Sequence, residues 1–350
     1  MKKVDFDNEF KNPGSEYRSI PFWAWNDELD TDEIRRQIRE MKSCGIGGFF
    51  IHSRDGLETE YLSDKWFECV SAAVDEAKKS GMFSWLYDED RWPSGTCGGS
   101  ITATDKNGCK GLTLEVCFSV PEKIEGNVLV LYKAEVHEME IYSLERICNA
   151  DGLILSDKEA LLIARLEVSG KSEWFNNSAP PDNLSFDTVS DFINNTHKIY
   201  KKAVGSEFGK TIPGIFTDEP SLADRHASFN PNRSWIPWTE EFEKYFFEKR
   251  GYDVLDMIPY FYFNGEKSAK IRHDYWRTVS ERFKEAYSVQ IGDWCRENNL
   301  LFTGHFLQED KMGLSCRVNG SVMPHYAAED IQAIDMLTER TEEYITVKQC

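Results

Sequence analysis

The stretch Gly214-Ile-Phe-Thr-Asp-Glu-Pro220 decides the fold, because its apolar run ends in two adjacent carboxylates and stops at a proline. This pattern predicts a strand over residues 212–217 that presents Asp218 and Glu219 at its carboxyl end. Comparable apolar runs with polar ends span residues 22–26, 48–54, 83–89 and 302–309. Helical patterns separate them. Parallel strands with polar carboxyl ends are typical of barrel enzymes, so we predict an α/β fold of the (β/α)8 TIM type.

The number of strands indicates that this barrel is incomplete in the chain. Asp30 or Thr31 is expected to cap a first helix, and Ser63 to cap a second helix that ends at Gly81. Barrel strands are predicted at residues 22–26, 45–51, 82–87, 212–217, 301–307 and 331–337. A closed barrel of this class has eight strands. Either residues after Cys350 complete the barrel, or this count is two too low.

A segment of different character interrupts the barrel pattern. Apolar residues alternate strictly from Leu112 to Val120, and further β-rich runs follow at 128–132, 139–147 and 161–168 without a helical period. This alternation predicts an inserted antiparallel β-rich module. We therefore expect three parts: residues 1–100 with strands one to three, the module at 101–182, and residues 183–350 with strands four to six.

Composition excludes several classes of partner. The chain has 350 residues, a formal net charge of −19, and 60 acidic against 41 basic residues. Such a charge repels nucleic acid and anionic membranes, and no apolar run is long enough to cross a bilayer. The nine cysteines show no C-x-x-C spacing. Without an apolar leader after the N-terminal lysines, a cytoplasmic protein is expected, unless a leader has been removed. The oligomeric state is not indicated.

The strand-end carboxylates are the candidate catalytic groups. Glu219 is the candidate general acid, and Asp218 beside it could raise its pKa, since like charges resist joint ionisation. Glu309 follows the fifth strand, and His305 lies on the same side of that strand. Glu309 could act as base, nucleophile or metal ligand, or pair with Lys311. The structural alternative for Glu219 is an acidic turn or helix cap.

The segment Tyr87–Gly99 is rich in charge, tryptophan and glycine, a composition typical of an ordered active-site loop. Glycines allow a backbone to approach a ligand, while arginine and tryptophan offer a forked donor and a flat apolar face. The alternative is a structural turn. The candidate substrate-binding residues are Trp25, Asn26, His52, Arg54, Asp88, Glu89, Arg91, Trp92 and His305. Asp335 and Glu329 are further candidate acids.

Common enzyme signatures are absent from the sequence. It contains no H-E-x-x-H, G-x-S-x-G, P-loop or EF-hand pattern. The commonest zinc, serine-hydrolase, nucleotide and calcium-sensor sites are therefore not indicated. An irregular calcium site built from carboxylates and carbonyls would leave no such pattern.

Four motifs together resemble glycoside hydrolase family 106, whose described members are α-L-rhamnosidases. They are Pro21-Phe-Trp-Ala-Trp-Asn26, Met41-Lys-Ser-Cys-Gly-Ile-Gly-Gly48, Trp92-Pro-Ser-Gly-Thr-Cys-Gly-Gly99 and Ile215-Phe-Thr-Asp-Glu-Pro220. The resemblance implies a (β/α)8 catalytic domain, a general acid at Glu219 and a calcium ion near the sugar. It also implies a chain longer than 350 residues, and so a C-terminal truncation. The family's usual Asn-Gly-Pro-Gly-Trp is replaced here by Asp88-Glu-Asp-Arg-Trp92.

These patterns favour a glycoside hydrolase that cleaves a terminal sugar from a poly- or oligosaccharide by carboxylate acid/base chemistry. Rhamnose specificity is implied only by the resemblance. Two alternatives remain open: a non-catalytic carbohydrate-binding barrel, and a carboxylate-based metal-dependent hydrolase.

Overall fold

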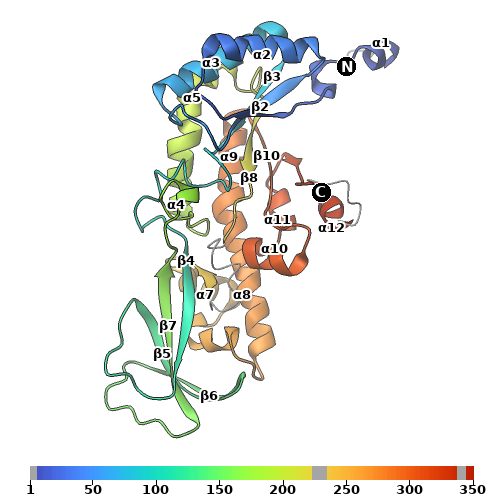
Figure 1. Cartoon of the computed structure of the whole chain (residues 1–350). Coiled ribbons are helices and arrows are strands. Elements are labelled where there is room, and N and C mark those ends of the chain that lie inside the picture. The colour runs from blue at the N-terminus through green and yellow to red at the C-terminus, as the bar shows by residue number, and fades with distance from the viewer. Residues whose placement is uncertain (1–5, 223–234, 337–343) are drawn as a thin grey trace.

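The strands that carry the polar ends form one parallel sheet. The computed structural model describes residues 6–222, 235–336 and 344–350 (Figure 1). Its parallel sheet runs β1-β2-β3-β8-β10-β11 in the described part of the chain. The strands are β1 (Phe22–Trp25), β2 (Gly48–Ser53), β3 (Phe83–Tyr87), β8 (Gly214–Asp218), β10 (Leu301–His305) and β11 (Ile331–Gln332). The six predicted strands are confirmed in order and direction, and Leu337 lies outside the described residues. A complete barrel is not shown.

Alternation along the strands separates the two faces of this sheet. On one face Phe22, Phe50 and Phe216 contact one another edge to face. On the other face Trp23 packs against Trp25 and Phe49. Helices α2 (Thr31–Ser43) and α3 (Asp64–Ser80) lie over the strands β1–β3 (Figure 1). The first face also carries the polar strand ends.

The residues that cap these two helices agree with the sequence prediction. The side chain of Asp30 accepts hydrogen bonds from the backbone N–H groups of Asp32 and Glu33, so Asp30 rather than Thr31 caps α2. Ser63 caps α3 in the same way, and Gly81 ends it in the left-handed conformation.

Two longer helices pass through a π-helical turn. One consists of α4 (Phe186–Phe192), the π-turn η3 (Ile193–His197) and α5 (Lys198–Val204). The other consists of α8 (Ser268–Phe283), the π-turn η7 (Lys284–Val289) and α9 (Gln290–Glu297). π-Turns inside α-helices frequently lie at functional sites, and η7 contacts the parallel sheet, because the Tyr287 and Thr217 hydroxyl oxygens are 2.7 Å apart.

The β-rich segment forms a second, antiparallel sheet at the other end of the molecule from β1–β3 (Figure 1). Its order is β6-β5-β7-β4-β9. The strands are β4 (Lys110–Cys117), β5 (Val128–His137), β6 (Glu140–Ile147), β7 (Glu159–Val168) and β9 (Ile236–Trp238). The sequence did not predict β9, since three residues around Pro237 are too few to show alternation. Because β9 follows β8 in the chain, residues after 182 also contribute to this sheet.

A buried ion pair ties the antiparallel sheet to the segment that precedes α4. Lys110 at the start of β4 places its Nζ 3.5 Å from Asp182 Oδ2, and Thr239 donates a 2.7 Å hydrogen bond to the same oxygen. Burial raises the pKa of Asp182 to about 6 although Lys110 acts in the opposite direction. The antiparallel sheet is therefore fixed to the segments on either side of it.

The other helices cover the sheets and their ends. They are α1 (Phe6–Lys11), η1 (Ser15–Tyr17), η2 (Glu173–Phe175), η4 (Gly205–Glu207), α7 (Phe242–Arg250), η5 (Val254–Asp256), η6 (Ile258–Phe261), α10 (Met312–Asn319), α11 (Met323–Tyr326) and α12 (Tyr344–Gln349). None of the helices in the described ranges is long and apolar enough to cross a membrane.

Candidate active site

The register of two central strands brings an aspartate and a histidine together. β8 and β10 pair in parallel with Asp218 opposite His305. The His305 Nε2 lies 2.8 Å from Asp218 Oδ1, and both side chains are more than nine-tenths buried. Both residues end their strands, so the pair lies at the carboxyl edge of the sheet, where α/β folds place their ligands.

Two further residues hold Asp218, one through its carboxylate and one through its backbone. The hydroxyl of Tyr87, at the end of β3, donates a 2.6 Å hydrogen bond to Asp218 Oδ2. The backbone N–H and C=O of Asp218 bond to Ser94 Oγ and to the Ser94 N–H, each at 2.8 Å. Three neighbouring segments therefore converge on this one residue.

Electrostatics stabilise both charges of the pair. Burial alone would lower the pKa of His305, but the hydrogen bond that His305 donates to Asp218 and the charge of Asp218 outweigh burial and raise that pKa to about 9. Burial likewise acts to raise the pKa of Asp218, yet His305 and Tyr87 lower it overall. At neutral pH the site thus holds an imidazolium and a carboxylate.

Glu219 has the opposite character. Burial, followed by the negative charge of Asp218, raises its pKa to about 7. Its backbone has a positive φ of 46°, a conformation that costs free energy in a non-glycine residue and is found most often at functional sites. A hydrogen bond from its N–H to the carbonyl of His305 holds this turn at 3.1 Å. Glu219 can therefore carry a proton near neutral pH beside an ionised neighbour.

Glu309 is enclosed by its own hydrogen bonds. Its Oε1 accepts from the backbone N–H of Asp335 at 2.7 Å, and its Oε2 accepts from the Tyr326 hydroxyl at 3.0 Å. Burial raises its pKa, while the bond from Asp335 acts against this rise. Its charge contributes to the raised pKa of Glu219. Glu309 is thus within electrostatic reach of Glu219, with both oxygens already bonded.

Glu329 is the neighbour of Glu309 and has no hydrogen-bond partner among the described residues for either carboxyl oxygen. Burial, with a contribution from the charge of Glu309, raises its pKa to about 9. It is therefore a neutral acid at physiological pH.

The loop after β3 is built around the carboxylate of Glu89. Its oxygens accept hydrogen bonds from the backbone N–H groups of Asp90 and of four consecutive residues, Gly95–Gly98, at 2.6–3.0 Å. Glu89 is 1% exposed. The prediction that Glu89 contacts a substrate is therefore wrong. Its carboxylate oxygens already accept the hydrogen bonds that fold the loop.

Asp88 is also internal. It is fully buried, and its Oδ1 accepts a 2.6 Å hydrogen bond from Ser94 Oγ. Burial raises its pKa well above the usual range. Its proposed contact with substrate is therefore corrected to a positioning role, since Ser94 in turn bonds to Asp218.

Trp25 must likewise be reassigned to the core. It is 2% exposed and packs edge to face on Trp66, so no sugar ring can stack on its indole. The strand places it on the face opposite the site, since the pleat alternates. The next residue, Asn26, is exposed.

His52 lies on the site face of β2. Its ring stacks at 4.9 Å on Phe22 and meets Tyr87 edge to face at 4.1 Å. Burial lowers its pKa to about 4 in spite of the charge of Asp218, so it is a neutral imidazole. Its Nε2 is buried without a partner in the described part of the chain.

Arg54, Arg91 and Trp92 form an outer cluster. The Arg54 guanidinium lies 4.4 Å above the Trp92 ring, and that ring meets Trp174 edge to face at 4.5 Å. Arg91 pairs with Asp55 at 2.9 Å. The expected sugar contacts of these three residues remain predictions.

One group of side chains could hold a metal ion. Glu219, His305 and Asp335 each offer a ligand atom, and these atoms lie within 4.8 Å of one another. Calcium takes six to eight oxygen ligands, which can include backbone carbonyls and waters, so these two carboxylates would supply only part of its shell and the expected calcium ion stays a prediction. The same donors suit zinc or manganese. His305 also bonds to Asp218, and a metal-binding histidine usually has such a partner.

Sequence reasoning did not identify Tyr87 and Ser94, and it ranked Asp335 below Glu309. In the sequence, Tyr87 is indistinguishable from the last core residue of an apolar strand. Ser94 follows a proline inside a loop, and no pattern marks its bonds to β8. Asp335 lies inside the sixth predicted strand, residues 331–337, whereas the observed strand β11 ends at Gln332, so the sequence did not mark Asp335 as a strand-end residue.

Comparison with known proteins supports the fold. No protein-family model matches the chain. A putative beta-glucuronidase from Formosa agariphila is 19% identical over 365 residues, covering 86% of this chain and 30% of that protein. The structure of a rhamnosidase from Novosphingobium sp. PP1Y matches with a TM-score of 0.63 and 12% identity, over 94% of this chain and 49% of that one.

This likeness shows a glycoside hydrolase-like fold. The chain spans 30% of the length of the first of these two proteins and 49% of the second. A beta-galactosidase from the haloarchaeon Halorubrum lacusprofundi gives a TM-score of 0.43, too low to support an argument.

The loop is expected to depend on Glu89. In Glu89→Gln the amide NH2 replaces one acceptor oxygen and faces backbone N–H groups, so the free energy of unfolding should fall by about 2–4 kcal/mol in urea titrations. Glu58→Gln, an exposed change, is the control and should stay within about 0.5 kcal/mol of the parent. An equal stability of both variants would contradict the role of Glu89.

The charge of His305 is expected to depend on Asp218. In Asp218→Asn the raising effect is lost while burial remains, so the pKa of His305 should fall from about 9 to below its ordinary value. Imidazole NMR titration measures this change. An unchanged pKa of His305 would show that Asp218 does not hold its proton.

Proposed function

We propose that this chain carries the acid-bearing site of a glycoside hydrolase that removes a terminal sugar from an oligo- or polysaccharide. The observation that best supports this proposal is the contrast between two adjacent carboxyl groups. The pKa of Asp218 is lowered, whereas that of Glu219 is raised to about 7. Carboxyls whose surroundings separate their pKa values are the groups that divide acid and base roles. The fold likeness to a rhamnosidase supports the reaction class.

In the proposed reaction Glu219 donates its proton to the glycosidic oxygen as the bond to the sugar breaks. The departing alcohol gains that proton and Glu219 becomes a carboxylate. The positive charge of His305 favours this ionised form of Glu219. Asp218 does not react: it keeps His305 protonated and oriented.

The second carboxylate of the reaction is proposed to be Glu309. It lies in electrostatic reach of Glu219, and although burial raises its pKa, the hydrogen bonds from Asp335 and Tyr326 act in favour of its ionised form. It would act on the sugar or through water. We further propose a deoxy-hexose of the rhamnose type as the sugar, on the fold likeness alone.

Glu219→Gln should lower kcat by about 100- to 10,000-fold, because the amide cannot donate the proton. The loss should be greater with alkyl glycosides than with nitrophenyl glycosides, whose leaving group needs little protonation. In the parent protein activity should fall as the pH rises through about 7, where Glu219 loses its proton.

The assay uses α-L-rhamnosides, β-D-galactosides and β-D-glucuronides, with Glu58→Gln as the matched control and circular dichroism as the check of folding. Full activity of Glu219→Gln would exclude this acid. Sugar binding without turnover in the parent would instead favour the non-catalytic carbohydrate-binding alternative.

A second candidate function is a metal-dependent hydrolase, favoured by the grouping of Glu219, His305 and Asp335. In that protein these residues would bind the ion, which would supply an activated water or polarise an oxygen of the substrate. The proton on His305 competes with the ion, so affinity should rise with pH.

Calorimetric titration with zinc, manganese and calcium separates the two functions. The metal hypothesis predicts binding of zinc or manganese that strengthens from pH 6 to about pH 9 and is lost in Asp335→Asn. It also predicts loss of activity in EDTA. The absence of binding, with activity unaffected by EDTA, would eliminate it.

A further inference from the structure

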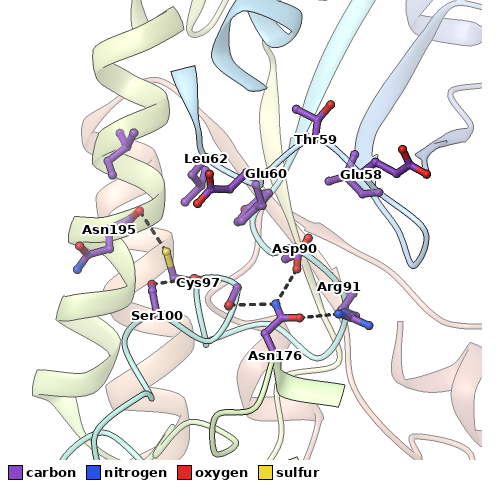
Figure 2. A pocket seen from close by; sticks show the side chains of 14 residues that line it. Glu58, Thr59, Glu60, Leu62, Asp90, Arg91, Cys97, Ser100, Asn176 and Asn195 are labelled. Carbon is purple, nitrogen blue, oxygen red and sulfur yellow. Dashed lines mark hydrogen bonds between the residues drawn. The ribbon is translucent and has the colours of Figure 1, made fainter. Parts of the chain in front are cut away.

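A second cavity lies beside the loop that reaches Asp218. It has a volume of about 480 Å³ and is bounded by the segment 57–62, the loop 90–100, Asn176 and the π-turn η3 (Figure 2). A volume of this size is usual for a site that takes a small organic ligand. None of the groups assigned to the proposed reaction lines it.

The loop wall of the cavity is rigid. Asp90 accepts hydrogen bonds from Ser53 Oγ at 2.9 Å and from Asn176 Nδ2 at 2.8 Å. Asn176 Nδ2 also bonds to the carbonyl of Gly98 at 3.0 Å. On the far wall, the Sγ of Cys97 donates to the carbonyl of Asn195 at 3.3 Å. These bonds fix both walls, so a ligand would meet a preformed surface.

The cationic side chain of the cavity is already neutralised. Arg91 donates to Asp55 at 2.9 Å and to Asn176 Oδ1 at 2.5 Å. Its guanidinium therefore offers a bound anion little unopposed charge.

The polar groups left for a ligand include acceptors. Glu60 forms no hydrogen bond through its carboxylate within the described ranges, and Figure 2 shows that carboxylate directed toward the helix that carries Asn195. Asn195 donates through Nδ2 to the carbonyl of Asp191 at 2.7 Å, which leaves its Oδ1 to accept. Glu58 points away from them in the same view. The Thr59 hydroxyl and the remaining N–H groups of Arg91 can also donate, so the cavity suits a ligand whose groups both donate and accept hydrogen bonds, as sugar hydroxyls do.

The cavity also offers an apolar platform. The ring of Tyr61 lines it, while the Tyr61 hydroxyl is buried behind the wall. The ring lies against Gly98, where an added Cβ would come within 3.3 Å of Tyr61 Cδ1. Leu57, Leu62 and Ile199 complete this surface. An apolar face with acceptors at its edge matches a sugar ring, which has a C–H face and hydroxyl donors at its rim.

We propose that this cavity is a second saccharide-binding site, separate from the reacting groups, that takes an uncharged sugar and rejects a uronate. The rejection follows from Glu60 and Asp90, whose charges repel a carboxylate while Arg91 is neutralised. This proposal does not require Glu219 to be an acid.

The same loop connects the cavity to the reacting groups. Asp90, Cys97 and Gly98 face the cavity, whereas Ser94 bonds to Asp218. Glu89 ties both parts together through its bonds to Asp90 and Gly95–Gly98. A sugar bound here would therefore lie on the loop that positions Asp218.

The test is a titration of Glu219→Gln, which cannot turn substrate over, with matched sugars: D-glucose with D-glucuronate, D-galactose with D-galacturonate, and L-rhamnose. Saturation-transfer NMR and calorimetry report binding. At least one neutral sugar should bind below about 50 mM, and its uronate at least about tenfold more weakly.

Variants locate the binding. Glu60→Ala combined with Asn195→Ala should weaken the neutral sugar about tenfold or more, whereas Glu28→Ala, an exposed change outside the cavity lining, should leave its affinity unchanged. Binding that persists in the double variant, equal binding of the uronate, or no binding of any neutral sugar would overturn the proposal. Hydrolysis by the parent protein is measured separately, so a failed glycosidase assay leaves this result unaffected.

Discussion

The site depends on the parallel register of β8 and β10, which places Asp218 directly opposite His305. A shift of one residue in either strand would turn the side chain of that strand to the helix-covered face and leave its partner behind, because successive strand residues alternate. The register thus determines whether the two charges meet. Their hydrogen bond then allows an imidazolium to exist in a buried place where it would otherwise lose its proton. The raised pKa of Glu219 depends on the same arrangement, since Asp218 supplies part of it.

The loop after β3 is the second constraint, and its order comes from a buried carboxylate. Glu89 takes up the backbone N–H groups that a tight, glycine-rich loop would otherwise leave unpaired. This is why a loop with Gly95, Gly98 and Gly99 can be rigid despite its composition. The rigid loop positions residues on both of its sides, since Ser94 bonds to Asp218 and Asp90 faces the second cavity.

Sequence reasoning predicted the parallel strands, the β-rich module and the strand-end residues Glu219 and His305, because each rests on a local pattern. It misplaced Trp25 and Glu89, because tryptophan and glutamate can lie either in the core or at the surface. The pleat of the strand turns Trp25 into the core, and hydrogen bonds to residues up to nine positions away bury Glu89. Tyr87 was missed for a related reason. Its role at the site depends on a hydrogen bond to Asp218, which is 131 residues away in the chain. A local sequence pattern cannot reveal such a contact.

The two proposed functions make opposite demands on one imidazole. As part of an acid site, His305 must keep its proton, so that its charge favours the carboxylate that Glu219 becomes. As a metal ligand it must be deprotonated, and its bond to Asp218 would then orient a neutral ring. The structure as described has Asp218 ionised and His305 with a pKa of about 9, so a metal ion at neutral pH must displace a proton held by roughly two units of pKa. This cost favours the acid site over the metal site.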